Sequence, residues 1–126
     1  MRNYLILLFL SAFLIVVKGE ENEPEFLQPF LKFIVPVGHN VTFRCEFKNL
    51  GNFKIGWIKE NDNKLVLALG SRMITQDLRI SANLNENFYE LYITKVDLND
   101  SGIYACRVNT DPPKQQIGIL EVIETI

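Results

Sequence analysis

Short segments in which apolar and polar residues alternate recur along the chain. In residues 41–47 every odd position is apolar and every even position is polar. Residues 89–93 and 104–108 repeat this period of two. Such a period is typical of a β-strand that buries one face. Five further segments are also strand candidates: residues 33–37, 53–59, 65–69, 79–82 and 117–123.

Clusters of Gly, Pro, Asn and Asp separate these segments, for example at residues 100–102 and 111–113. Such clusters are typical of turns, and many short strands at this spacing indicate an antiparallel sandwich or barrel. We therefore predict an all-β domain over residues 31–126. An acidic leader over residues 20–30 precedes it, and we expect its first residues to be a solvated tail.

The chain begins with a basic residue, Arg2, followed by an almost unbroken apolar run over residues 4–17. A charged start, a short apolar run and a small residue at Gly19 predict a cleaved secretory signal peptide over residues 1–19. The alternative is a membrane anchor, but a span needs about 20 apolar residues. Removal of Arg2 and Lys18 leaves 11 basic and 15 acidic residues, a net charge of −4.

Composition excludes several classes of function. The 126 residues suffice for one domain, and a net charge of −2 provides no basic patch for nucleic acid. Two Cys and one His are too few for a Cys/His zinc site with four ligands. His39 lies in a turn, and no Gly-x-Ser-x-Gly motif is present. We expect no enzyme activity, no cofactor, no metal and no small-molecule substrate.

Secretion changes the interpretation of Cys45 and Cys106. An even pair of cysteines in an oxidising compartment predicts a disulfide, and two buried free thiols are the alternative. Closing a loop of about 62 residues would remove roughly 4 kcal/mol of conformational entropy from the unfolded state.

Trp57 follows Cys45 by twelve residues, and Cys106 completes a Cys-Trp-Cys order on separate strands. Residues 100–106 resemble the D-x-G-x-Y-x-C signature of variable-type immunoglobulin domains. This resemblance implies a Greek-key β-sandwich with one inter-sheet disulfide, and a hydrogen bond from the Tyr104 hydroxyl to upstream backbone. It also implies an Asp100–Arg79 ion pair. We predict a core of Val41, Phe43, Cys45, Ile55, Trp57, Ile80, Leu91, Ile93, Tyr104, Cys106, Val108, Leu120 and Val122.

A closer resemblance covers about residues 33–123. Residues 35–45, 50–59 and especially 108–118 are similar to the first domain of the DIP family (defective-proboscis-response-interacting proteins), which are lachesin-like neuronal proteins of arthropods. Members of that family are surface glycoproteins with three immunoglobulin domains. Their membrane-distal domain binds Dpr proteins, or each other, through the sheet of strands C, C′, F and G.

The residues themselves also indicate an interaction face on that sheet. Because Trp57 must face the core, Gly56 and Ile58 on the expected strand C, residues 53–59, face outward. Strand C′, residues 65–69, is apolar on both faces, so either its Leu set or its Val/Ala set adds to an exposed apolar patch. Strand F is expected at residues 104–108 and strand G at residues 117–123, and the expected polar rim is Arg107, Asn109, Asp111 and Gln116. The expected partner-binding face is Gly56, Ile58, Leu65, Leu67, Leu69, Arg107, Asn109, Asp111, Gln116, Ile117 and Ile119.

Two Asn-x-Ser/Thr sequons are candidate glycosylation sites, at Asn40 and Asn99. We favour Asn40, which lies in a turn, because Asn99 adjoins the Asp100 pair. Both lie away from the expected binding face.

Two functional hypotheses follow. The first is cell adhesion or neuronal recognition, in which the chain binds another immunoglobulin domain, Dpr-like or a second copy of itself. The second is a soluble secreted binder, a decoy or an immune-recognition protein, that uses the same face. We expect an extracellular location, and attachment to the cell surface if the chain is a fragment of a longer anchored protein. The chain shows no membrane span after residue 19.

Overall fold

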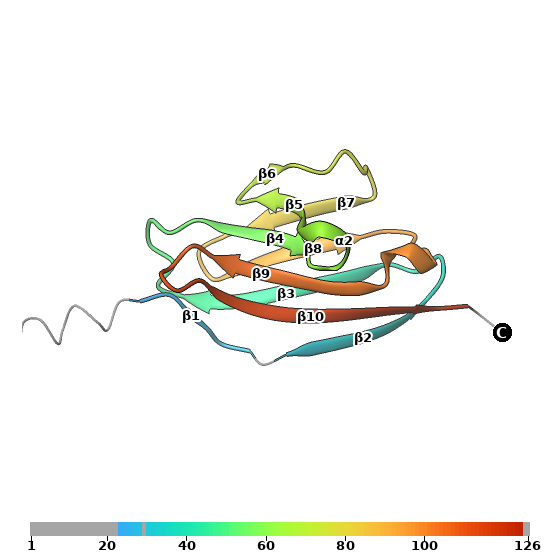
Figure 1. The fold of residues 1–126 in the computed structure, drawn as a ribbon, viewed down its shortest axis with the longest axis horizontal. Helices are drawn as coiled ribbons and strands as arrows, with labels where there is room; N and C mark the ends of the chain where they lie inside the picture. The colour runs from blue at the N-terminus through green and yellow to red at the C-terminus, as the bar shows by residue number, and fades with distance from the viewer. Residues whose placement is uncertain (1–22, 29, 125–126) are drawn as a thin grey trace, which may run out of the picture.

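Two β-sheets packed face to face make up most of the fold (Figure 1). The computed structural model describes residues 23–28 and 30–124, so the expected signal peptide over residues 1–19 lies outside the described residues. The four-stranded sheet has the order β1-β3-β8-β7, and the six-stranded sheet has the order β2-β10-β9-β4-β5-β6. The strands are β1 Glu25–Phe26, β2 Leu31–Pro36, β3 Val41–Lys48, β4 Ile55–Lys59, β5 Leu65–Leu69, β6 Arg72–Met73, β7 Ile80–Leu84, β8 Phe88–Ile93, β9 Gly102–Val108 and β10 Lys114–Ile123.

This arrangement confirms the predicted variable-type sandwich. All strand pairs are antiparallel except β2 with β10. The first part of the chain is divided between the two sheets, because β1 pairs with β3 and β2 pairs with β10. Two short helical turns complete the described fold, α2 at Asn61–Lys64 and the 3₁₀ turn η2 at Leu98–Asp100. The alternating sequence of β3 produces alternating burial, because its odd positions face the other sheet.

The predicted disulfide is confirmed, and it joins Cys45 on β3 to Cys106 on β9, thereby linking the two sheets. Every residue of the predicted core is buried except Ile80, which is half-buried against it. Trp57 and Tyr104 lie in this core, where both pack near the ring of Phe43. The core also contains residues that the pattern did not place there: Phe47, Leu67, Ala68, Tyr89 and Val96.

A network of hydrogen bonds fixes the turn before β9. The Arg79 guanidinium donates to both carboxylate oxygens of Asp100, over 2.7 and 3.0 Å, and also donates to Asp77 over 2.8 Å. The Tyr104 hydroxyl donates to the backbone oxygen of Asp100. Burial acts to raise the pKa of Asp100, but the hydrogen bonds from Arg79 and from the Asp97 backbone N–H outweigh it and hold that pKa below its usual range.

Replacing this carboxylate, Asp100→Asn, should lower the free energy of unfolding by about 2 kcal/mol at neutral pH, because Arg79 loses a charged acceptor. A lowered pKa in the folded state stabilises the protein above the unfolded pKa, and this stabilisation is lost as pH falls through the folded value. The difference between the two proteins should therefore shrink below about pH 4. Urea unfolding at several pH values measures it, and Asp111→Asn at an exposed site is the matched control.

The beginning of the described chain differs from the solvated tail that its acidic composition predicts. Glu25 and Phe26 form β1, which pairs with the end of β3, and Pro24 is fully buried. Glu25 lies 3.4 Å from the Lys48 ammonium, and the Lys114 ammonium lies 3.4 Å from the Glu23 carboxylate and donates to the Pro24 carbonyl over 2.8 Å. The acidic residues are thus held by cations that are distant in sequence.

Candidate protein-interaction face

The outward side of the six-stranded sheet carries a row of apolar residues. Strand register places Val66, Ile58, Ala105 and Ile117 beside one another across β5, β4, β9 and β10. Ala105 is fully covered, whereas its three neighbours in the row are half-buried. A second pair, Ile103 and Ile119, extends the apolar surface across β9 and β10. We call this side of the sheet the outer face.

A hollow of about 210 Å³ lies at one end of the outer face, beside the start of β4 and the β9–β10 turn. Gly56 lines this hollow, and a Cβ at that position would come to 3.0 Å from the Ala68 oxygen and the Leu69 side chain, so a larger residue would be crowded there. Leu69, which pairs with Gly56, is 52% exposed at the rim. The hollow is lined by Lys54, Ile55, Gly56, Ile58, Leu69, Arg107, Asn109 and Pro113.

Arg107 places a charged group on this apolar surface, and its charge is paired. Its guanidinium lies 2.8 Å from a carboxylate oxygen of Glu60 and donates to Gln115 Oε1 over 2.8 and 3.1 Å. Because Arg107 is opposite Gly56 in the sheet, the ion pair with Glu60 requires the Arg107 side chain to lie along the strands. The outer face therefore presents a neutralised polar group beside its apolar row.

The β9–β10 turn is fastened to the start of β4. Asn109 accepts a hydrogen bond from the Lys54 N–H through Oδ1 over 2.8 Å, and its own N–H donates to the Lys54 carbonyl over 3.0 Å. Asp111 is exposed at the tip of the turn. Of the expected polar rim, Asn109 thus positions the turn, and Asp111 is the member free to face solvent.

The expectation for Leu67 is wrong, since this side chain is 2% exposed and belongs to the core. The pairing of β4 with β5 shifts between Trp57 and Ile58, so that Ala68 is opposite Trp57 and Val66 is opposite Ile58. A bulge of this kind inserts one extra residue and breaks the period of two. Leu65, Leu67 and Leu69 therefore do not share one face, and Leu65 is exposed at the start of β5.

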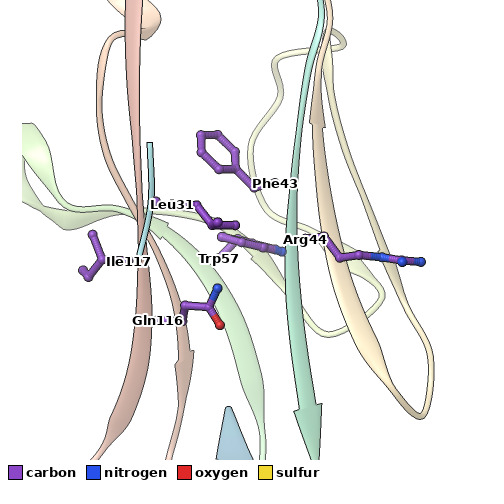
Figure 2. Close-up of a pocket in the computed structure, with 7 residues that line it drawn as sticks. Leu31, Phe43, Arg44, Trp57, Gln116 and Ile117 are labelled. Atoms are coloured by element: carbon purple, nitrogen blue, oxygen red, sulfur yellow. The ribbon is translucent and has the colours of Figure 1, made fainter. Parts of the chain in front are cut away.

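The prediction that Gln116 belongs to the polar rim is also wrong, because this residue is buried between the sheets. It pairs with Cys106 and shares the inward positions of Leu120 and Val122. Figure 2 shows Gln116 and Ile117 on opposite sides of β10, with Gln116 on the side of Trp57. The cavity that Gln116 and Trp57 line has a volume of about 10 Å³, which is about that of one water and too small for an organic ligand.

Glu60 and Gln115 contribute to the outer face but were not predicted. Glu60 could have been predicted from the alternation of the strand, since it lies two residues after Ile58 and four after Gly56, which both face outward. Its N–H still donates to the Ile103 carbonyl of β9, so the strand geometry continues to Glu60. Val66 belonged to the Val/Ala set that was the alternative for residues 65–69. Because of the bulge, Val66 lies opposite Ile58 and Leu69 lies opposite Gly56, so one residue of each set faces outward.

No group of three His, Cys, Asp or Glu side chains within residues 23–28 and 30–124 is placed to hold a metal ion. Burial raises the pKa of Tyr89 to about 12, and the Tyr89 hydroxyl donates to the Gly70 carbonyl over 2.6 Å.

Within residues 23–28 and 30–124, no helix has the length and apolar character needed to cross a membrane.

Comparison with known proteins places this geometry in context. The model of the immunoglobulin V-set domain matches residues 31–122. Lachesin of Drosophila melanogaster is 27% identical over 77 residues, which are 60% of this chain and 21% of Lachesin. The chain thus corresponds to about a fifth of the length of that relative.

Solved structures of immunoglobulin domains are similar to the chain. A crystal structure of Dpr1 IG1 bound to DIP-eta IG1 superposes with a TM-score of 0.74 and 31% identity, covering 80% of this chain and 96% of that one. A crystal structure of DIP-gamma IG1+IG2 superposes with a TM-score of 0.73 and 34% identity, covering 79% of this chain and 48% of that one. The expected resemblance to first domains of DIP and lachesin-like proteins is confirmed.

Proposed function

We propose that this chain, which belongs to the immunoglobulin V-set family, is an extracellular recognition domain that binds another immunoglobulin domain through its outer face. The observation that carries the proposal is the apolar row of Val66, Ile58 and Ile117, which remain partly exposed on the outward side of the sheet. Water-facing sheets ordinarily alternate apolar with polar residues, and a contiguous exposed apolar surface is typical of an interaction site.

The surroundings of the row suit a protein partner. A standard interface buries about 800 Å² on each side, with an apolar centre and a polar rim. The hollow above Gly56 can accept an apolar side chain, and Leu69 and Pro113 border it. Because Arg107 and Glu60 already neutralise each other, covering them leaves no unpaired charge, which would otherwise oppose binding.

The relatives support the class of partner. Their solved structures include one immunoglobulin domain bound to another, Dpr1 IG1 with DIP-eta IG1. We infer that the partner is an immunoglobulin domain, either Dpr-like or a second copy of this chain, and that the function is cell adhesion or neuronal recognition. Domains of this adhesion type are extracellular or lie at the cell surface.

Placing a charge in the row tests the proposal. The full chain, secreted and multimerised for avidity, is assayed by surface plasmon resonance against Dpr1 IG1, DIP-eta IG1 and itself. Ile58→Asp and Ile117→Asp should each weaken the binding found by roughly 30-fold or more, the equivalent of about 2 kcal/mol at the centre of an interface.

The matched control is Leu78→Asp, since Leu78 is 100% exposed in the connection between β6 and β7 and is not part of the row. It should leave binding unchanged, and circular dichroism should show all variants folded. Folded Ile58→Asp and Ile117→Asp proteins that bind as tightly as the unmodified chain would contradict the proposed face. Absence of binding across the panel, including to itself, would contradict the proposed class of partner.

A further inference from the structure

The turn between β2 and β3 holds Asn40 at the end of the sandwich away from the hollow (Figure 1). Two backbone hydrogen bonds join this turn to the turn after β8, from Gly38 N–H to the Val96 carbonyl and from Val96 N–H to the His39 carbonyl, over 2.8 and 2.9 Å. Asn40 adds a third, because its Oδ1 accepts from the Lys95 N–H over 3.0 Å. The side chain of Asn40 is therefore tied to the Lys95 backbone through its oxygen.

This hydrogen bond orients the two ends of the carboxamide differently. Oδ1 is turned toward the Lys95 backbone, so Nδ2 is directed away from it, and Asn40 is an exposed residue. Thr42, which completes the sequon, is also exposed, on the water-facing side of β3. Both polar members of this sequon thus remain accessible in the folded domain.

The second sequon, residues 99–101, makes hydrogen bonds with other parts of the fold. The carboxylate of Asp100 is bound by Arg79, and the Ser101 hydroxyl accepts a hydrogen bond from the Val122 N–H over 2.9 Å. The Asn99 carbonyl accepts from the Lys59 ammonium over 2.7 Å. Because its central and hydroxyl residues serve the fold, this sequon is the less suitable of the two.

We propose that Asn40 carries an N-linked oligosaccharide. Nδ2 forms a bond to C1 of the first sugar of an oligosaccharide carried on a lipid pyrophosphate. The bond between C1 and the pyrophosphate oxygen breaks, the lipid pyrophosphate leaves with its electron pair, and Nδ2 loses one proton. Oδ1 is unchanged, so the hydrogen bond from Lys95 persists in the modified protein.

The position of Asn40 keeps a bulky glycan away from the outer face. The β2–β3 turn and the β9–β10 turn beside the hollow lie at opposite ends of the sandwich (Figure 1). The glycan would solvate the end near the Lys95 turn and leave the face free. The inference is independent of the proposed binding function, because it rests on the sequon and its own contacts.

Expression of the full chain in animal cells tests the proposal. Medium and membrane fractions are treated with an amidase that removes N-glycans and converts the modified Asn to Asp, and peptide mass spectrometry identifies the position. We expect conversion at residue 40 in the unmodified chain and in Thr42→Ser, and its loss in Thr42→Ala. An Asn40 that stays unmodified in both fractions, or that is still converted in Thr42→Ala, would overturn the proposal.

Thr42→Ala is preferred to a change at Asn40 because it removes the sequon and preserves the hydrogen bond to Lys95. Circular dichroism should show that Thr42→Ala is folded like the unmodified chain. Asn99→Gln is the matched control for the other sequon, and it should leave the conversion at residue 40 unchanged.

Discussion

Replacing Cys45 and Cys106 together by alanine should lower the free energy of unfolding by about 4 kcal/mol. The two cysteines are 61 residues apart in sequence and join strands of different sheets, so the cross-link removes much of the freedom of the unfolded chain. Domains of this size have about 5–15 kcal/mol of stability in total. The variant should therefore unfold at a much lower urea concentration.

Fluorescence of Trp57 can follow this unfolding, because the chain has one Trp and it is 3% exposed in the core. The control is the unmodified chain with its disulfide reduced, which retains both sulfur atoms and separates the cross-link from the packing. A stability within about 1 kcal/mol of the oxidised protein would show that packing alone holds the sheets together, contrary to the entropy argument.

The sequence predicted those strands best in which one face meets the core. In β3, alternation determines which residues are buried, and Phe43 and Cys45 follow it. In β5, by contrast, apolar residues occupy both faces, so no periodicity could assign its register. The bulge opposite Trp57, which sends Leu67 inward, is a property of the strand pair.

Polar residues were misjudged where tertiary contacts decide their position. Gln116 was predicted to lie in the polar rim because it is polar and close to a turn. In the structure β10 already begins at Lys114, so Gln116 is part of the strand and faces inward like Leu120. The ion pair of Arg107 with Glu60 joins residues 47 positions apart. Contacts at such separations are set by the packed fold and leave no trace in a local pattern.

Phe43→Ala should lower the free energy of unfolding by about 4 kcal/mol, because Phe43 fills the centre of the space between the sheets. Its ring lies 5.3 Å from that of Phe33 in an edge-to-face arrangement and 5.1 Å from the stacked ring of Tyr104. The same change at Phe88, whose ring lies under the Arg44 guanidinium on the outside of the sheet, should cost about 1 kcal/mol. Urea unfolding of both variants makes the comparison.

Gly118 allows a sharper form of this prediction, because a Cβ there would come within 2.7 Å of the Phe43 ring. Gly118→Ala should lower the free energy of unfolding of the unmodified chain, but should lower it much less in a chain that already carries Phe43→Ala, where the space is open. If the effects of the two substitutions simply add in the double variant, the contact between Gly118 and Phe43 is contradicted. Gly118 separates Ile117 from Ile119 on β10, so Phe43 supports the outer face from behind. Phe43→Ala should therefore weaken partner binding under conditions in which the protein is still folded, although Phe43 is 1% exposed and cannot touch the partner.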